Sequence, residues 1–272
     1  MDFLEGKSIK LMAADCLELM ELMPDNSIDL TVTSPPYDNL RDYNGNNQFW
    51  SEEVWQAVIK ELYRITKKGG VVVWVVGDAT LAGSETGSSF RQAVFAMDCG
   101  FNLHDTMIYE KNTSTFPARR TGKRYTQIFE YMFVFSKGAP KTGNLICDKP
   151  NKWAGHTNWG KNTQRGKDGA LVETKDIKPV PDFSPRNNIW RYVVGGGFAT
   201  KDKNAHKHPA IFPENLANDH ILSWSNEGDI VFDPFMGSGT TGKMALLNNR
   251  KFIGSEIDLD YFEIARDRIN NA

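Results

Sequence analysis

Two hydrophobic periods alternate along this chain of 272 residues. Short apolar runs, such as the uninterrupted VVVWVV, are typical of strands that are buried on both faces of a sheet. Longer stretches with apolar residues three and four positions apart are typical of helices that pack one face against such a sheet. The predicted strands are 28–33, 71–78, 103–111, 127–137, 229–235 and 251–257. The predicted helices are 51–70, 88–101, 213–225, about 241–249 and 260 to about 270.

The helix predicted between 51 and 70 has clear signals at both ends. Ser51 is a residue type that caps helices by accepting a hydrogen bond from a free backbone N–H, and apolar residues follow it at helical spacing. Gly69 and Gly70 predict the end of the helix, because glycine readily adopts the left-handed conformation that closes helices.

The order of the elements predicts the fold class. Strands that alternate with helices form a mostly parallel, twisted α/β sheet with helices on both faces. The segments 103–111 and 127–137 are rich in aromatic and apolar residues, and we expect them to pair as an antiparallel hairpin. In such sheets ligands bind beyond the carboxyl ends of the strands. This chain has two conspicuous turns at such ends, one rich in proline and one rich in glycine.

Charge is unevenly distributed, although the formal net charge is only −2. The stretch from Lys111 to Lys207 holds 19 Lys and Arg against 7 Asp and Glu, so a basic middle lies between two acidic ends. This asymmetry favours a surface that faces a polyanion such as nucleic acid, and a solvated lysine-rich insertion is the alternative. The periodic pattern also weakens between about 112 and 207, apart from the strand at 127–137, which predicts an irregular insertion.

Composition favours a cytoplasmic protein. The longest apolar run is far too short to span a bilayer, and residues 1–10 lack the apolar core of a signal peptide. Cys16, Cys99 and Cys147 form no CxxC pair, so the sequence predicts neither a disulfide framework nor a zinc cluster. We therefore expect a protein of a reducing compartment, without a membrane segment and without a metal site.

The glycine-rich turn predicts a site for a nucleoside cofactor. Gly237, Gly239 and Gly242 fit the pattern G-x-G-x-x-G between a predicted strand and helix, and Glu256 closes the next strand. Glycines let the backbone approach a ligand closely, and the acid can accept hydrogen bonds from ribose hydroxyls. Asp233 adds negative charge near the turn, which suits the cationic S-adenosylmethionine better than a dinucleotide. A dinucleotide fold would also place this unit early, whereas here it comes last.

The proline-rich turn, TVTSPPYDNLRDY, runs from Thr31 to Tyr43. Its two prolines stiffen the chain where the strand 28–33 ends, because proline fixes its own φ and restricts the residue before it. Ser34 lies before the prolines and Tyr37 after them. Alone, the motif is consistent with a stiff loop and a packing tyrosine. Together with the glycine turn, it favours a catalytic surface.

These motifs resemble, in their order and spacing, the β-class S-adenosylmethionine-dependent DNA amino-methyltransferases, which modify cytosine N4 or adenine N6. TSPPY is similar to the catalytic motif of that family, and DPFMGSGTTG followed by FIGSEID is similar to its cofactor motif. HPAIFPENL at 208–216 is similar to its His-Pro segment, and AADCLELM at 13–20 to its N-terminal segment. The resemblance implies a Rossmann-like methyltransferase fold in one circularly permuted domain, 1–272, whose target-recognition region lies within 112–205.

The resemblance also implies a role for each matching residue. Ser34 and the Pro35 carbonyl would accept hydrogen bonds from the target amino group. Pro36 would stiffen that turn, and Tyr37 would stack on the base once it is extruded from the duplex. The residues implied for the cofactor are Asp15, His208, Asp233, Phe235, Gly237, Gly239, Thr240, Thr241 and Glu256.

The implied partner is double-stranded DNA. Basic loop residues are expected to contact its phosphates, although a solvated loop is the alternative. These residues are Arg41, Arg119, Arg120, Lys123 and Arg124. A cognate restriction endonuclease is a further candidate partner, and both a monomer and a homodimer stay open.

Several functions stay open at this point. Methylation of cytosine carbon-5 is disfavoured, because it needs a cysteine nucleophile and no cysteine here follows a proline. Among the enzymes that the chain resembles, serine at the position of Ser34 is commoner in cytosine enzymes, so cytosine N4 is favoured and adenine N6 is the alternative. A nicotinamide-dependent oxidoreductase, a silent nucleic-acid-binding module, and an RNA or protein methyltransferase are remote alternatives.

Overall fold

The computed structural model describes residues 8–37, 45, 50–113, 124–157, 163–173, 178–195, 197–211 and 213–272. The chain divides into two compact units. The main unit consists of Met1–Asn144 and Asn188–Ala272, and the small unit consists of Leu145–Asn187. The predicted recognition region, 112–205, includes all of the small unit and parts of the main unit, and its role stays a prediction.

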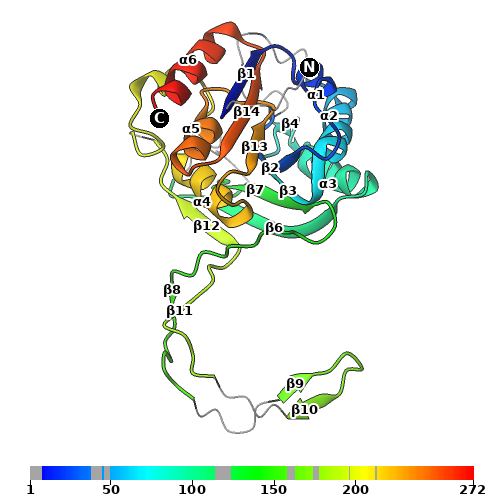
Figure 1. Ribbon diagram of the computed structural model, residues 1–272, viewed down its shortest axis with the longest axis vertical. Coiled ribbons are helices and arrows are strands. Elements are labelled where there is room, and N and C mark those ends of the chain that lie inside the picture. Colours follow the sequence, from blue (N-terminus) through cyan, green and yellow to red (C-terminus); the bar gives the residue numbers. More distant parts are fainter. Residues whose placement is uncertain are drawn as a thin grey trace. The chain divides into compact units, whose positions relative to one another are not determined.

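A mostly parallel sheet forms the centre of the main unit (Figure 1). In spatial order, the strands described are β1 (Ile9–Ala13), β14 (Lys251–Glu256), β13 (Ile230–Asp233), β2 (Ile28–Thr33), β3 (Thr66–Val76), β7 (Phe129–Ser136), β6 (Asn102–Lys111) and β12 (Ile189–Tyr192). Neighbouring strands run parallel, except that β7 is antiparallel to both β3 and β6. The predicted fold class, including the antiparallel hairpin, is therefore confirmed.

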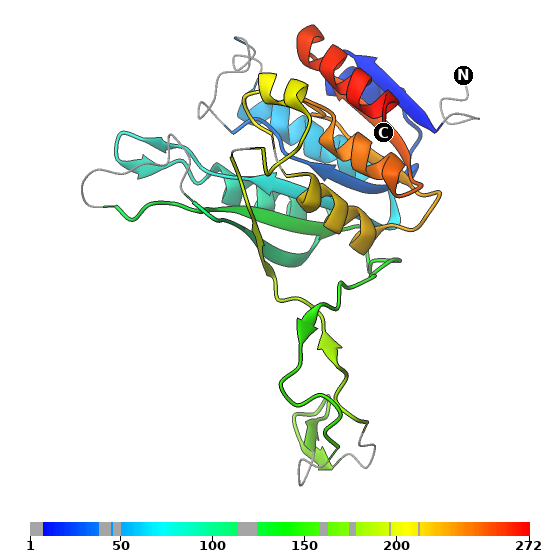
Figure 2. The same ribbon diagram turned by 90° about the vertical axis from the view of Figure 1, so that its left-hand side faces the viewer.

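Helices cover both faces of this sheet, as predicted (Figure 2). One face carries α1 (Cys16–Glu21), α2 (Glu52–Ile65) and α3 (Ser88–Asp98). The other carries α4 (Glu214–Trp224), α5 (Thr240–Leu247) and α6 (Leu259–Asn270). A cluster of buried apolar side chains lies between α1–α3 and the sheet, where Leu62 and Trp74 are almost fully buried. Burial of apolar surface on both faces explains the uninterrupted apolar runs of the central strands.

Helix α2 begins where its sequence predicts but ends earlier. The Ser51 side chain accepts a hydrogen bond from a backbone N–H of the first turn, as a capping residue does. The helix ends at Ile65, and β3 begins at Thr66, which already pairs with Ile28 of β2. The expectation that the paired glycines end the helix was wrong, because strand pairing begins before them. They lie inside β3 near a register shift, where Gly69 has a φ of +82°.

Some short strands were missed by the sequence reading. β1 and β12 form the two edges of the large sheet, and each has too few residues to give a clear period. In the main unit β4 (Thr80–Leu81) pairs with β5 (Ser84–Glu85). In the small unit β8 (Lys149–Pro150) pairs with β11 (Phe183–Ser184), and β9 (Thr163–Arg165) pairs with β10 (Leu171–Glu173).

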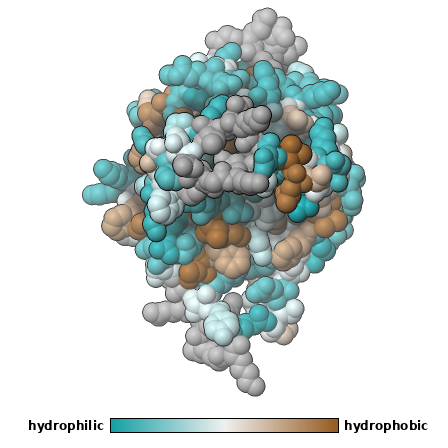
Figure 3. Space-filling model, turned by 90° about the horizontal axis from the view of Figure 1, so that it is seen from below, coloured by the Kyte–Doolittle hydropathy of each residue, from teal (hydrophilic) through white to brown (hydrophobic). Residues whose placement is uncertain are grey.

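Figure 3 shows one face of the molecule coloured by hydropathy. Hydrophilic residues cover most of the face seen in Figure 3, and hydrophobic residues form smaller groups between them. Within the described ranges, none of the helices has the length and apolar character needed to cross a membrane.

Lys137, directly after β7, binds backbone carbonyl groups at the carboxyl end of α2. Its Nζ donates hydrogen bonds to the carbonyl oxygens of Tyr63, at 2.7 Å, and Thr66, at 3.0 Å. We expect Lys137→Met to lower the free energy of unfolding by about 1–2 kcal/mol, because these carbonyls lose a charged donor. Urea denaturation measures the change. Lys251→Met, at an exposed position of β14, is the control. Equal stabilities of the two variants would contradict this expectation.

Candidate active site

The proline-rich and glycine-rich turns follow neighbouring strands. β2 pairs with β13 in parallel, with Leu30 opposite Val231, so both turns leave the same edge of the sheet. The Thr33 hydroxyl donates a buried hydrogen bond of 2.7 Å to the Asp233 carboxylate. This bond joins the ends of two strands that are 200 residues apart in the sequence. The expectation that the two motifs form one site is consistent with this geometry.

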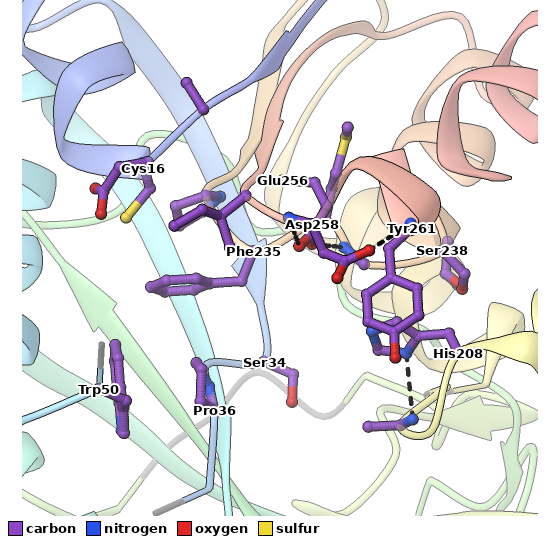
Figure 4. Close-up of a pocket in the computed structure, with 18 of the residues that line it drawn as sticks. Cys16, Ser34, Pro36, Trp50, His208, Phe235, Ser238, Glu256, Asp258 and Tyr261 are labelled. Carbon is purple, nitrogen blue, oxygen red and sulfur yellow. Dashed lines mark hydrogen bonds between the residues drawn. The ribbon is translucent and has the colours of Figure 1, made fainter. Parts of the chain in front are cut away.

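A pocket opens at this edge (Figure 4). Its lining comes from the residues after β1, β2, β13 and β14, from the start of α2, from α6 and from the segment before α4. The lining residues predicted from the sequence are Asp15, Ser34, Pro36, His208, Phe235, Gly237, Thr240 and Glu256. Those that were missed include Cys16, Trp50, Ser238, Asp258 and Tyr261. The predicted residues Pro35, Tyr37, Asp233, Gly239 and Thr241 are described but do not line it.

The missed lining residues had weak signals in the sequence. Trp50 lies just before α2, where a single tryptophan reads as a core residue, yet it contacts Phe235 edge-on with ring centroids 5.4 Å apart. Tyr261 lies in α6, and its ring centroid is 4.4 Å from that of His208. Asp258 caps α6 by accepting hydrogen bonds from two backbone N–H groups, including that of Tyr261. The sequence analysis did not single out Asp258; an acidic capping residue two positions after Glu256 is the signal that could have indicated it.

Glu256 holds the glycine turn against the next loop. One carboxylate oxygen accepts a hydrogen bond of 2.8 Å from Gly237 N, and the other accepts one of 3.0 Å from Asp258 N. Burial raises the pKa of the Glu256 carboxyl, and these backbone donors oppose that shift. Because each carboxylate oxygen has two lone pairs, the group retains acceptor capacity toward the pocket.

Gly237 is needed for the close approach of His208. It has a φ of +50°, and a Cβ at this position would lie 2.9 Å from His208 Nε2. The imidazole itself is held by its Nδ1, which accepts a 3.2 Å hydrogen bond from Ala210 N. The glycine thus allows an aromatic ring to form one wall of the pocket directly against the turn.

Asp233 is buried beneath the turn. Its side chain accepts hydrogen bonds from the Thr33 hydroxyl and from Phe235 N, at 2.7 and 3.1 Å. Burial raises the pKa of the Asp233 carboxyl to about 7, and the hydrogen bonds from Thr33 and Phe235 N only partly oppose this. In this structure the group therefore shapes the turn from below, and its predicted contact with a cofactor stays a prediction.

Arg268 of α6 ties the glycine turn to the segment that leads into the pocket. Its side chain is 5% exposed, and it forms ion pairs with Asp202 and Glu214 at 3.1 and 2.9 Å. Lys243 of α5 pairs with the same two carboxylates. Arg268 Nη1 also donates hydrogen bonds to the hydroxyl and the carbonyl of Ser238, which lies in the turn. The buried charge is thus compensated by partners on three elements.

The other predicted residues are placed as follows. Thr241 Oγ1 donates a hydrogen bond of 3.1 Å to Val32 O, so the start of α5 is fixed to β2. Asp15 caps α1 and accepts from Leu17 N at 2.8 Å. Burial, with a smaller contribution from Asp15, raises the pKa of the neighbouring Cys16 thiol, so this lining residue is unsuited to act as a nucleophile.

Tyr37 is buried, at 7% exposure, with its ring close to Gly77. Its hydroxyl is hydrogen bonded to Ser34 and Glu130. The predicted stacking of this ring on a base stays a prediction. Of the predicted DNA contacts, Arg124 donates a hydrogen bond to the Gly83 carbonyl and lies 3.7 Å from the Glu85 carboxylate. The other four, Arg41, Arg119, Arg120 and Lys123, lie outside the described residues.

Comparison with known proteins decides the family. A family model described as DNA methylase, which covers N6 and N4 methyltransferases, matches residues 28–267. This chain belongs to the N6/N4 DNA methylase family. The orphan methyltransferase M.BamHII of Bacillus amyloliquefaciens is 60% identical over 253 residues, which are 93% of this chain and 92% of the relative. The DNA adenine methyltransferase YhdJ of Escherichia coli K12 is 27% identical over 279 residues, 98% of this chain and 84% of YhdJ.

Solved structures show the same fold. The PvuII DNA methyltransferase, described as cytosine-N4-specific, superimposes with a TM-score of 0.70 at 22% identity, over 98% of this chain and 90% of that one. A protein from Thermus thermophilus, solved in complex with S-adenosyl-L-methionine, superimposes with a TM-score of 0.65 at 24% identity, over 96% and 93% of the two chains. This methylase is thus a DNA methyltransferase of the class that acts on cytosine N4 or adenine N6. The oxidoreductase and the silent binding module, open from the sequence, find no support here.

The pocket of this methylase fits S-adenosylmethionine, the ligand of the Thermus thermophilus protein. Carboxylates of Glu256 and Asp258 can accept hydrogen bonds from hydroxyl or ammonium groups, and rings of Phe235, Trp50 and Tyr261 offer apolar surface to a purine. Gly237 of the glycine turn and Thr240, the first residue of α5, both line the pocket, and glycine permits the close approach of a ligand.

The raised pKa of Asp233 makes stability depend on pH in a defined direction. An unfolded aspartate ionises near pH 3.8, whereas the folded one keeps its proton to about pH 7. The stabilisation that protonated Asp233 contributes to the wild type is therefore lost as the pH rises from about 4 to 7. Asp233→Asn cannot ionise, so its free energy of unfolding should not fall in this way. Relative to the wild type, it should therefore increase over this pH window by a few kcal/mol at most, because one unit of pKa shift corresponds to about 1.4 kcal/mol.

Urea denaturation without added cofactor, repeated between pH 4 and 8, measures this difference. Asp267→Asn, at an exposed position of α6, is the control for the amide substitution. A difference between Asp233→Asn and the wild type that stays constant over the whole range would show that the carboxyl ionises alike in both states.

The contact of Gly237 with His208 gives a test by ligand binding. We expect Gly237→Ala to weaken S-adenosylmethionine binding at least tenfold, because the new Cβ collides with the imidazole. Gly228→Ala is a matched control: its φ is +83°, and the described surroundings hold no atom within 4 Å of its added Cβ. Titration calorimetry compares the dissociation constants. Equal affinities of the two variants for S-adenosylmethionine would show that the His208 ring can move away from the added Cβ without weakening binding.

Proposed function

We propose that this methylase is a site-specific DNA methyltransferase that transfers the methyl group to cytosine N4. The observation that carries the proposal is the position of Ser34, which lines the same pocket as Glu256 and the glycine turn. A serine hydroxyl at this position, in place of a carboxylate, favours cytosine among the enzymes that the chain resembles. Adenine N6 is the alternative, and the adenine specificity named for YhdJ keeps it in view.

The residues of the proline turn would activate the amino group. The exocyclic nitrogen is a weak nucleophile, because its lone pair is conjugated with the ring. Ser34 Oγ and the Pro35 carbonyl would each accept a hydrogen bond from one amino proton and so draw the nitrogen toward tetrahedral geometry. The neighbouring prolines hold both acceptors in place, so little reorganisation is needed in the transition state.

The remaining lining residues would bind the cofactor. S-adenosylmethionine, when bound, supplies a methyl group on a positively charged sulfur. Glu256 would accept hydrogen bonds from ribose hydroxyls, and the rings of Phe235 and Trp50 would contact the purine. Asp15 and His208 line the same pocket and would complete the enclosure. Exclusion of water there strengthens every electrostatic contact with the reacting groups.

DNA would be bound as a duplex with the target base extruded, because a base inside the helix cannot reach this pocket. The basic region 112–205 would supply phosphate contacts. The relative M.BamHII is named an orphan methyltransferase, which favours a solitary enzyme over one paired with a restriction endonuclease. The choice between monomer and homodimer, and the cytoplasmic location, stay predictions.

Expression in a host without DNA methylation, followed by modification-sensitive long-read sequencing, tests the proposal. We expect N4-methylcytosine at one short recognition sequence, and we expect Ser34→Ala to reduce the modified fraction at least tenfold. N6-methyladenine instead would establish the alternative base. Unmodified DNA from cells that contain folded, cofactor-binding protein would contradict the proposed DNA substrate.

A further inference from the structure

A chain of hydrogen bonds leads from Ser34 away from the pocket. Ser34 Oγ and Tyr37 OH are 2.9 Å apart, and Tyr37 OH is 2.9 Å from Glu130 Oε2. The other oxygen of Glu130 forms an ion pair with Lys111 Nζ. The motif similarity of this methylase covers Ser34 and Tyr37 but gives no role to Glu130 or Lys111.

The sheet topology brings these four residues together. Ser34 and Tyr37 follow β2, and Lys111 is the last residue of β6. Because β7 runs antiparallel, its second residue, Glu130, lies at the same end of the sheet. At Gly77, directly after β3, an added Cβ would lie 3.5 Å from Glu130 Cγ and 3.8 Å from the Tyr37 ring. The chain of bonds is therefore packed on the β3 side as well.

The group is largely removed from water. Tyr37 is 7% exposed, and the side chains of Lys111 and Glu130 are 15% and 13% exposed. Hydrogen bonds in such surroundings are stronger and better ordered than the same bonds at the surface. Tyr109 also faces Glu130 from β6, and the carboxylate contributes to the raised pKa of its hydroxyl, after burial.

The chemistry of the groups sets the direction of every hydrogen bond. A carboxylate can only accept, so the Tyr37 hydroxyl must donate its hydrogen to Glu130. Tyr37 has one hydrogen, so its oxygen can then only accept from Ser34. The Ser34 hydrogen therefore points toward Tyr37, and the free lone pairs of Ser34 Oγ are left for the pocket.

We propose that Glu130 is a positioning residue which, through the Tyr37 hydroxyl, holds Ser34 as a hydrogen-bond acceptor for the target amino group. This inference rests on the proposed function, in which Ser34 accepts an amino proton. A free serine hydroxyl could as well point its hydrogen at the base, where it would meet an amino hydrogen. Lys111 keeps Glu130 oriented with one oxygen for Tyr37.

Two variants break the chain in different ways. Tyr37→Phe keeps the ring and removes the hydroxyl, so the Ser34 hydrogen loses its partner. Glu130→Gln keeps the shape, but Lys111 can only donate and so takes the amide oxygen. The amide nitrogen then faces Tyr37 and donates to it, which reverses the chain and turns the Ser34 hydrogen away from Tyr37.

The test is a single-turnover measurement of tritiated methyl transfer to genomic DNA from a methylation-free host, with enzyme in excess over sites and cofactor saturating. Rates are divided by the fraction of protein that binds S-adenosylmethionine, so partial misfolding does not count as slow chemistry. Glu110→Gln is the matched control. It removes a carboxylate next to Lys111 on β6 that is also ion paired, with Arg191, at the more exposed edge toward β12.

We expect Tyr37→Phe to slow methyl transfer at least tenfold and Glu130→Gln to slow it as much or more. The dissociation constants for cofactor and DNA should stay within twofold of the wild type, and Glu110→Gln should match the wild-type rate. A purely structural ion pair would change thermal stability without changing the normalised rate.

A wild-type rate of methyl transfer in Tyr37→Phe would overturn the inference, even if Glu130→Gln transferred the methyl group slowly. Because Tyr37→Phe keeps both charges of the ion pair, it tests the inference even if Glu130→Gln does not fold. Wild-type protein that binds cofactor but transfers no methyl group to DNA would instead overturn the proposed function, and the inference with it.

Discussion

The parallel pairing of β2 with β13 is the contact on which the rest of this methylase depends. It brings the proline turn and the glycine turn to one edge of the sheet, and the buried bond between Thr33 and Asp233 locks the two strand ends together. Neither turn makes a site alone. The proline turn contributes Ser34 and Pro36 to the pocket, and the glycine turn contributes Gly237 and Ser238. Their fixed distance is a property of adjacent strands, which are about 4.8 Å apart.

Around this contact, buried polar groups are held by partners from distant parts of the chain. Glu256 takes its hydrogen bonds from the glycine turn and the α6 cap, and Arg268 is balanced by two acids on other elements. Unpaired, such groups would each cost several kcal/mol of stability. Paired, they define the spacing of the loops that form the pocket. Electrostatic pairing thus fixes the loops that surround the pocket.

Much of this arrangement follows from local sequence signals. The strand 28–33 and the cap at Ser51 depend on local pattern alone and are found as expected. The end of α2 was missed, because the pairing of Thr66 with Ile28 is a contact between distant segments. The same reason explains Trp50, Tyr261 and the buried placement of Tyr37. A motif indicates which residues carry chemistry, whereas the direction of each side chain depends on neighbours that the motif does not contain.

The Arg268 cluster has a consequence for how the enzyme is made. The pocket wall begins with residues near 14, but the glycine turn is secured by an arginine at 268. During synthesis the early strands leave the ribosome long before that arginine does. On a nascent chain, the proline turn is therefore made well before the arginine that secures the glycine turn, and the glycine turn is secured only after α6 has packed against it.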